Sequence, residues 1–207
     1  LPLVHIELKR RGVPLQEAFN QINRYHRDSF WAGSGLFEYV QLFVISNGTL
    51  TKYYSNTTRF QHIDELGKQK SKGKKTSNSY EFTSWWADGR NHVIADLTGF
   101  ARTFLARHTL LNILTRYCVF TAEHDLLVMR PYQIAATERI LNRILISEYD
   151  PKRLGTPEAG GYVWHTPGSG KKLTSFKQAQ PASNMDGVDK VQFRVASTDL
   201  DYHTIKD

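Results

Sequence analysis

A glycine-rich segment near the carboxyl end of the sequence combines the residue types that bind phosphate. Residues 164–172 read Trp-His-Thr-Pro-Gly-Ser-Gly-Lys-Lys, and the candidate nucleotide ligands are Gly168, Ser169, Gly170, Lys171 and Lys172. Glycines let backbone N–H groups turn around an anion, and Lys171 is placed to reach the terminal phosphates. The apolar segment 160–164 precedes the loop and the helical stretch 173–179 follows it. This strand, loop and helix order favours a nucleotide-binding loop over a basic turn rich in Gly, Ser and Pro.

The residue after Lys171 departs from the usual phosphate-loop pattern. That position is normally Ser or Thr, whose hydroxyl ligates Mg²⁺, whereas here Lys172 supplies a cation. Thr174 comes two residues later, on a different face of the expected helix, and is a poor substitute. The sequence therefore supports phosphate binding more strongly than nucleotide hydrolysis.

At the other end of the chain, a carboxylate and an ammonium alternate along an apolar segment. Glu7 and Lys9 are two positions apart, so their side chains share one face of a strand. Together they could hold Mg²⁺ and steady or deprotonate an attacking water. Gln21 and Tyr25 are four positions apart and share one face of the next predicted helix. Such charge pairs are also common on solvated strand faces, and the residues alone leave that alternative open.

The composition favours an anionic partner. The formal net charge is +7 and the isoelectric point is about 9.5, so nucleic acid is the first candidate, with plain solubility as the alternative. Cys118 is the single cysteine, which excludes an intrachain disulfide and fits a reducing cytoplasm. No apolar run approaches the roughly 20 residues of a membrane span, so we expect no membrane association. Because a strand-like apolar segment begins at Leu1, we expect a fragment cut at both ends.

Hydrophobic periodicity and turn signals predict the order of the elements. Strands are expected at residues 1–8, 36–46, 52–54, 160–164 and 188–195, and helices at residues 14–27, 91–106, 109–117, 131–146 and 173–179. The lysine-rich segment 68–75 is expected to be a solvated loop, with contact to DNA phosphates as the alternative. The pattern breaks near residues 121–125, where we place a domain boundary. The last strand, helix and strand would form a βαβ unit, which implies a parallel sheet.

These segments resemble the R subunits of type I restriction enzymes, in the same order and over almost the whole chain. The stretches that carry the resemblance are residues 7–12, 21–25, 42–49, 109–114, 128–138, 165–171 and 199–202. In that family the first domain, which would span residues 1–122, is a PD-(D/E)xK endonuclease. The resemblance makes Glu7 a catalytic metal ligand and Lys9 the catalytic lysine. It places Gln21 and Tyr25 in a helical motif near the scissile DNA. The family's preceding Asp has no counterpart, so we expect the chain by itself to cut poorly or not at all.

The second domain, residues 123–207, resembles the first RecA-like lobe of a superfamily 2 translocase, so the whole fold is expected to be α/β. By that resemblance Gln133 reads the adenine edge of ATP, while the glycine loop and Lys171 hold the phosphates. The family has Thr where this sequence has Pro167 and Lys172, and these departures bear on Mg²⁺ coordination and on the rate of ATP hydrolysis. The expected cofactors are therefore ATP and Mg²⁺.

The resemblance implies a restriction endonuclease subunit that couples ATP-driven translocation of double-stranded DNA to Mg²⁺-dependent cleavage. Its partners would be a methylation (M) subunit and a specificity (S) subunit, because phosphate contacts supply affinity for DNA without reading its sequence. The alternative is a degenerate, non-catalytic nucleotide- or DNA-binding module, and Lys172 is its best support. A stand-alone P-loop kinase is disfavoured because the loop follows a nuclease-like pattern. Nucleotide binding that does not depend on Mg²⁺ would favour the degenerate module.

Overall fold

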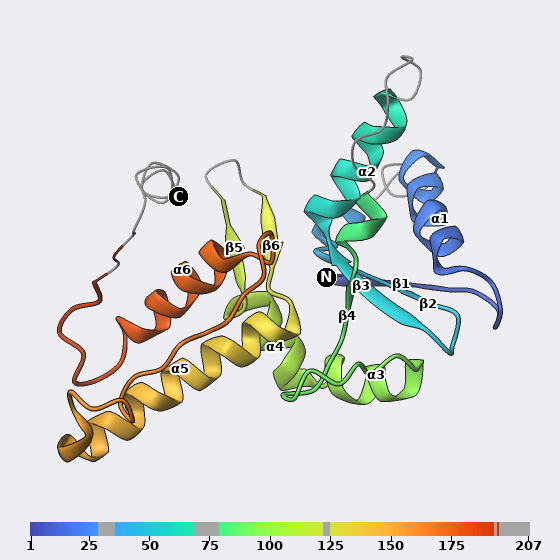
Figure 1. The fold of residues 1–207 in the computed structure, drawn as a ribbon. Coiled ribbons are helices and arrows are strands. Elements are labelled where there is room, and N and C mark those ends of the chain that lie inside the picture. Colours follow the sequence, from blue (N-terminus) through green and yellow to red (C-terminus); the bar gives the residue numbers. More distant parts are fainter. Residues whose placement is uncertain (29–35, 69–78, 122–124, 193, 195–207) are drawn as a thin grey trace. The chain divides into compact units, whose positions relative to one another are not determined.

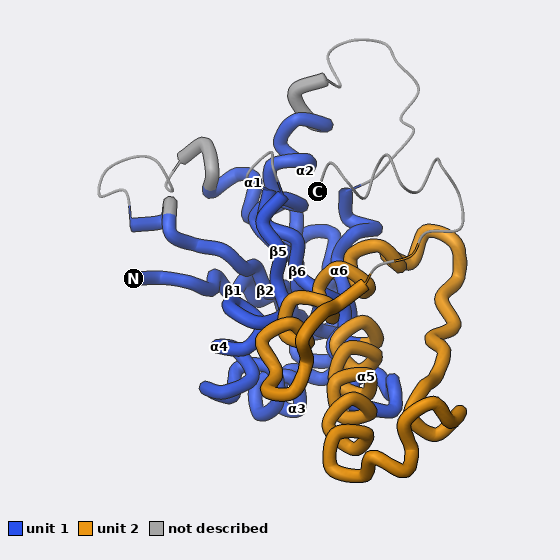
Figure 2. Tube along the Cα trace, turned by 90° about the vertical axis from the view of Figure 1, so that its left-hand side faces the viewer, with its two compact units in different colours: residues 1–131 blue, residues 132–207 orange. Residues whose placement is uncertain are grey.

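The computed structural model describes residues 1–28, 36–68, 79–121, 125–192 and 194 of the 207-residue chain (Figure 1). The chain divides into two compact units, Leu1–Pro131 and Tyr132–Asp207, which are coloured separately in Figure 2. No helix among the described residues is long and apolar enough to cross a membrane.

A four-stranded sheet forms the centre of the first unit. Its strands are β1 (Val4–Leu8), β2 (Leu42–Ser46), β3 (Thr51–Ser55) and β4 (Ser84–Trp85), in that spatial order. β1 runs parallel to β2, and the other two strand pairs are antiparallel. In the parallel pair His5 lies opposite Phe43 and Glu7 lies opposite Ile45. This register decides which side chains of β1 share a face with the core.

The predicted turn between β2 and β3 is confirmed. Asn47 accepts hydrogen bonds at Oδ1 from the backbone N–H groups of Thr49 (3.1 Å) and Leu50 (2.8 Å). Gly48 has φ of 85°, a conformation that glycine adopts without strain. The Asn-Gly signal in the sequence therefore marks the turn correctly.

Helices cover both faces of this sheet (Figure 1). On one face lie α1 (Leu15–Asp28) and α2 (Asn56–Lys68), and on the other lie α3 (Leu97–Phe104) and α4 (Arg107–Thr115). The buried core on the α1 face consists of Leu15, Ala18, Phe19, Ile22, Val40, Phe43, Ile45 and Tyr54. The core on the opposite face consists of Leu42, Val44, Tyr53, Phe100, Phe104 and Ile113. All five residues of β2 are buried, because alternate side chains enter the two cores.

Two short 3₁₀ helices and a β-hairpin complete the first unit. The 3₁₀ helices are η1 (Leu36–Tyr39) and η2 (Ser79–Phe82), and the hairpin joins β5 (Cys118–Phe120) to β6 (Leu126–Val128). The hydroxyl of Thr57, in the first turn of α2, donates to the carbonyl oxygen of Leu126 at 2.9 Å. This bond ties the hairpin to the helix that follows β3.

The second unit is built on two helices, α5 (Pro131–Tyr149) and α6 (Lys171–Ala182), with the 3₁₀ helix η3 (Pro151–Arg153) between them. Pro131 lies at the first helical position of α5, where its missing N–H group would have no helical partner. The glycine loop lies directly before α6, as the sequence predicts.

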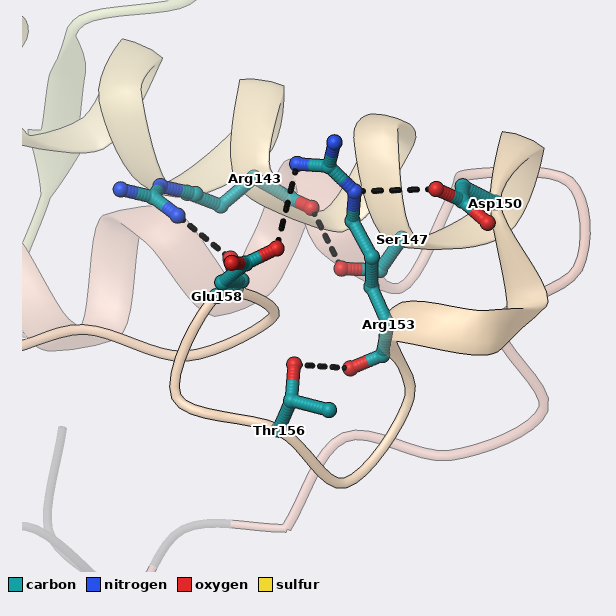
Figure 3. Close-up of polar contacts among 6 residues, drawn as sticks. All are labelled: Arg143, Ser147, Asp150, Arg153, Thr156 and Glu158. Atoms are coloured by element: carbon teal, nitrogen blue, oxygen red, sulfur yellow. Dashed lines mark hydrogen bonds and ion pairs between the residues drawn. The ribbon is translucent and has the colours of Figure 1, made fainter.

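The turn that follows α5 is closed by ion pairs and hydrogen bonds (Figure 3). Nε of Arg153 lies 3.0 Å from Asp150 Oδ2, and Nη1 of Arg153 lies 3.7 Å from Glu158 Oε2. Arg143, in the second half of α5, donates a hydrogen bond to the backbone carbonyl of Glu158. Because these side chains are largely exposed, their pairing fixes the path of the turn more than it stabilises the fold.

The helix predicted at residues 91–106 begins six residues later, at Leu97. Val93 forms a β-bridge with Ala87, and Asn91 has φ of 67°, so the chain before Asp96 is not helical. Asp96 caps the helix by accepting from the N–H of Gly99 at 2.7 Å. The apolar spacing predicts the helix itself, but it places the start of the helix before the amino-terminal cap at Asp96.

The strands predicted at residues 160–164 and 188–195 are wrong for the described part of these segments. Residues 160–164, 188–192 and 194 form no strand and join no sheet with the described residues, so the predicted βαβ unit is not formed. Tyr162 and Trp164 are 90% and 87% exposed. A strand requires a hydrogen-bonded neighbour, and apolar composition alone does not supply one. The first half of the predicted strand 36–46 is also not a strand, because residues 36–39 form η1.

The mixed α/β class is confirmed, and the helices predicted at residues 14–27, 109–117, 131–146 and 173–179 are present within a few residues. The lysine-rich segment 68–75 lies outside the described residues beyond Lys68. The predicted PD-(D/E)xK core, the RecA-like lobe and the domain boundary at residues 122 and 123 remain predictions.

Candidate functional sites

The alternation of β1 gathers three titratable side chains on the face of the sheet that α1 covers. His5, Glu7 and Lys9 alternate with Ile6 and Leu8, which are exposed on the other face. The N–H of Lys9 donates to the carbonyl of Ser46 at 2.8 Å, which continues the β1–β2 ladder by one residue. The sheet register therefore holds Lys9 on the same face as Glu7.

Each carboxylate oxygen of Glu7 has a basic neighbour. Nζ of Lys9 lies 3.0 Å from Oε1, and Nε2 of His5 lies 3.8 Å from Oε2. Glu7 is buried, and a buried carboxylate requires a partner charge or hydrogen bonds to remain ionised. The geometry therefore brings Glu7 and Lys9 together as the sequence predicts, and it adds His5, which the sequence reasoning missed.

The ring of His5 connects Glu7 to the predicted helical motif on α1. It packs edge-on against the ring of Tyr25, with centroids 6.1 Å apart, and lies tilted against the ring of Phe43, with centroids 6.0 Å apart. Burial lowers the pKa of His5 below its ordinary value of 6.5, and the Glu7 carboxylate opposes this shift. Gln21 lies on the same helix, where its side-chain oxygen accepts a hydrogen bond from Arg24. Tyr25 thus contacts His5, which in turn lies next to Glu7. The hydrogen bond between Gln21 and Arg24 stays within α1.

A buried cation lies beside Phe43, the ring that also contacts His5. Arg59 on α2 is 4% exposed, and its guanidinium carbon lies 5.3 Å from the centre of the Phe43 ring. Its Nε donates to Asn56 Oδ1 at 2.9 Å. Burial lowers the pKa of Arg59, and its charge acts on both Tyr54 and His5.

Tyr54 on β3 is the other buried titratable group of this region. Burial raises the pKa of Tyr54 well above its ordinary value; Arg59 opposes the shift and Glu7 adds to it. The ring of Tyr54 stacks on Phe43 at 5.4 Å. The alternation of His5 with Glu7 was visible in the sequence and could have identified His5. Nothing local in the sequence indicates that Arg59 or Tyr54 belongs to the same neighbourhood.

Glu7 is the residue of this cluster best suited to hold a divalent cation. Among the residues that the structure describes, no group of three His, Cys, Asp or Glu side chains is placed to bind a metal. Mg²⁺ is commonly held by one or two carboxylates, together with water and substrate phosphates. The described residues therefore fit one protein ligand to such an ion and do not form a complete protein cage.

The glycine loop has the backbone geometry that an anion site requires. Gly168 and Gly170 have φ of 76° and 80°, and Gly170 is the residue before the first turn of α6. The N–H of Thr174 donates to the carbonyl of Gly170 at 3.1 Å, which closes that turn. The first N–H groups of a helix lack acceptors within the helix, so they remain available to an anion. Lys171 and Lys172 are exposed in the same turn.

The predicted adenine-reading residue, Gln133, packs directly against this loop. It is 3% exposed, and its Nε2 donates to the carbonyl oxygens of Ser169 at 3.4 Å and Gly170 at 3.2 Å. A methyl group at Gly170 would lie 2.6 Å from Nε2 of Gln133. Gln133 and the glycine loop, which the sequence predicts to bind the same nucleotide, are therefore in direct contact. The bonded residues are 36 and 37 positions apart in the chain.

Comparison with known proteins assigns both ends of the chain to sequence families. Residues 1–62 match the family described as Type I restriction enzyme R protein N terminus, and residues 132–207 match the family described as SWI2/SNF2 ATPase.

Curated relatives match most of the chain. The type I restriction enzyme EcoprrI endonuclease subunit of Escherichia coli is 50% identical over 165 residues, which cover 80% of this chain and 48% of that protein. The type I restriction enzyme SauCOLORF180P endonuclease subunit of Staphylococcus aureus (strain COL) is 40% identical over 207 residues, covering 99% of this chain and 19% of that protein. The chain thus spans about half or less of the length of these two relatives.

Proposed function

Because this chain belongs to the R-subunit family of type I restriction enzymes, we propose that it contributes both the nuclease centre and the nucleotide loop of a DNA-translocating restriction endonuclease. The intact enzyme would couple ATP-driven translocation of double-stranded DNA to Mg²⁺-dependent cleavage. The first unit would carry the cleavage chemistry, and the second would bind ATP. The paired side chains of Glu7 and Lys9 are the observation that best supports the proposal.

The cleavage step would rest on a division of work between these two residues. Glu7 would hold Mg²⁺ together with water and a DNA phosphate; the ion lowers the pKa of bound water and neutralises charge on the phosphate. Lys9 is close enough to Glu7 to hold the attacking water and to stabilise the added negative charge at phosphorus. Tyr25 and Gln21, on the helix beside β1, would line the approach of the DNA strand. Glu7 is buried, and its carboxylate lies 3.0 Å from the ammonium of Lys9. This fits a catalytic pair better than a charge pair on a solvated strand face.

The nucleotide step would rest on the loop before α6. Backbone N–H groups around Ser169 and Gly170 would receive the phosphates, Lys171 would neutralise the terminal ones, and Gln133 would read the adenine edge. Lys172, at the position of the usual Mg²⁺-binding hydroxyl, would add a second cation to the site.

The second candidate function is a degenerate module that binds nucleotide or DNA without catalysis, and Lys172 is the observation that favours it. A lysine cannot ligate Mg²⁺, so a site of this kind would bind ATP equally well with and without the ion. The substitution Lys172→Thr restores a hydroxyl. If the module is degenerate, ATP affinity of the parent is independent of Mg²⁺, and Lys172→Thr makes it dependent.

Partners follow from the family and from charge. The net charge of +7 supports binding to the phosphates of double-stranded DNA, and sequence recognition would come from a specificity subunit acting with a methylation subunit. We propose the cytoplasm as the place of action.

The test is cleavage of unmethylated plasmid by a complete R subunit that carries this sequence, assembled with methylation and specificity subunits. Three variants are compared with the parent: Lys9→Ala, Lys171→Ala and, as a control on an exposed lysine, Lys152→Ala. We expect Lys9→Ala to hydrolyse ATP without cutting, Lys171→Ala to do neither, and Lys152→Ala to do both. Cleavage by Lys9→Ala at the parent rate would refute the assignment of the nuclease centre. A parent that binds DNA but neither hydrolyses ATP nor cuts would favour the degenerate module.

A further inference from the structure

The first turn of α5 holds the carbonyl groups of the glycine loop. The hydroxyl of Tyr132 donates to the carbonyl oxygen of Ser169 at 2.7 Å, the usual length of an O–H···O hydrogen bond. The neighbouring Gln133 contacts the same carbonyl at 3.4 Å and that of Gly170 at 3.2 Å. Both carbonyls are therefore contacted from α5, and that of Gly170 is also held within α6 by the N–H (3.1 Å) and the hydroxyl (3.2 Å) of Thr174.

Anchoring a carbonyl also fixes the direction of the N–H group in the same peptide. A trans peptide is planar, and its C=O and N–H bonds point in opposite directions. The carbonyl of Ser169 shares a peptide with the N–H of Gly170, and the carbonyl of Gly170 shares one with the N–H of Lys171. Because Tyr132 holds the carbonyl of Ser169, the N–H of Gly170 points away from Tyr132. The N–H of Lys171 is oriented by α6 as well, through Thr174.

Ser169 is held at its side chain as well. Its hydroxyl donates to the carbonyl of Thr166 at 2.6 Å, so its oxygen accepts from Nδ1 of His165 at 3.1 Å. This network assigns the proton of a neutral His165 to Nδ1. The ring of His165 also packs edge-on against Tyr132, with centroids 5.8 Å apart. Tyr132 thus contacts the loop at Ser169 directly and through His165.

The two anchors on α5 differ in what they can do once a nucleotide is bound. If Gln133 turns its amide toward adenine, as proposed above, it gives up its bonds to the loop carbonyls. The proposed nucleotide site assigns the hydroxyl of Tyr132 no contact with the base, so its bond to Ser169 is retained when nucleotide is bound.

We propose that Tyr132 is a positioning residue for nucleotide phosphates, acting through the carbonyl of Ser169. This inference rests on the proposed nucleotide site and names the residue that orients it. Tyr132 acts on phosphate binding and not on base recognition. Its removal therefore weakens every ligand with the same phosphate chain by the same factor, whatever its base.

The experiment measures the dissociation constants of ATP, GTP and inorganic tripolyphosphate for the full chain by titration calorimetry. Tyr132→Phe removes only the hydroxyl, and the matched control is Tyr162→Phe, at a tyrosine of the same unit that is 90% exposed. We expect Tyr132→Phe to weaken all three ligands by a common factor of about three to ten, the range of one net hydrogen bond. We expect Tyr162→Phe to leave all three unchanged. Thermal melting of each variant separates a loss of folded protein from a loss of affinity.

Each other outcome overturns the proposal in a distinguishable way. Unchanged affinities in Tyr132→Phe, with a parent that binds ATP, refute the role of Tyr132 and leave the nucleotide site intact. A changed ratio of ATP to GTP affinity assigns Tyr132 to base recognition. A parent that binds none of the three ligands refutes the proposed nucleotide site, and this inference with it.

Discussion

The hydroxyl of Thr57 donates a 2.9 Å hydrogen bond to the carbonyl oxygen of Leu126, a residue 69 positions further along the chain. Both residues are buried, so water cannot replace the bond when it is lost. The contact joins the amino end of α2 to the β5–β6 hairpin. It is a polar link between two segments of the first unit that lie far apart in the sequence.

The substitution Thr57→Val keeps the shape of the side chain and removes its donor. We expect it to lower the free energy of unfolding by about 1–3 kcal/mol, because a buried carbonyl loses a partner. Urea unfolding followed by circular dichroism measures the change. Thr115→Val is the control, since Thr115 makes a similar bond of 2.8 Å to the Leu111 carbonyl in an exposed position. Equal losses of unfolding free energy in the two variants would contradict the prediction that the buried bond of Thr57 contributes more than the exposed bond of Thr115.

Gly170→Ala is expected to weaken nucleotide binding more than a matched glycine substitution does. The new methyl group would lie 2.6 Å from Nε2 of Gln133, so the buried amide would have to move out of contact with the loop. Gly155→Ala is the matched control, because Gly155 also has a positive φ, of 78°, but a methyl group there would have no atom within 4 Å. Both variants carry the same kind of backbone strain. ATP affinity by calorimetry should fall in Gly170→Ala and remain near the parent value in Gly155→Ala.

The stability of the first unit should fall on acidification below pH 6.5, in part because of His5. Burial lowers the pKa of His5 in the folded chain below its ordinary value of 6.5. As pH falls through 6.5 the unfolded chain therefore binds a proton first, which favours unfolding; above 6.5 both states are neutral and the contribution is complete. Unfolding free energies measured on either side of pH 6.5 should show a smaller difference in His5→Gln than in the parent. His108→Gln, at an exposed histidine, serves as the control, and an unchanged difference in His5→Gln would contradict the prediction.

Lys52→Met should destabilise the fold by about 1–2 kcal/mol, through the loss of two cation–π contacts. Nζ of Lys52 lies 4.9 Å from the centres of the Tyr80 and Trp85 rings, and it donates to Thr83 Oγ1 at 3.0 Å. Methionine retains the length and apolar character of the stem, so packing changes little. Tryptophan fluorescence during urea unfolding reports the change, because Trp85 is one of the two rings. Lys152→Met, at an exposed lysine, should leave the transition unchanged.

Local patterns predicted the elements that depend on local forces. The spacing of Leu15, Ala18, Phe19 and Ile22 identifies α1 because these side chains face one core. The Asn47–Gly48 turn fixes the β2–β3 hairpin in the same way. The start of α3 could not be found by apolar spacing, since the cap at Asp96 and the bridge at Val93 outweigh it.

The candidate sites were predictable only where their residues lie close in sequence. Glu7 and Lys9 alternate on one strand, so their pairing follows from strand geometry. The contacts of Arg59, and those of Gln133 with Ser169, depend on how segments tens of residues apart pack together. No local pattern carries that information. For the same reason, the apolar composition of residues 160–164 predicted a strand although no described strand pairs with them.

β1 is also an edge strand, and its charges have a consequence for handling the protein. Among the described strands it pairs with β2 along one side, while Ile6 and Leu8 are 41% and 56% exposed. An exposed apolar edge invites pairing between molecules, and charged side chains on the strand oppose it. Lys9, whose side chain is 23% exposed, would therefore help to keep copies of the chain apart in addition to its proposed role in cleavage. A double variant such as Glu7→Gln with Lys9→Met should self-associate, and its light scattering should be measured before any loss of cleavage is attributed to lost chemistry.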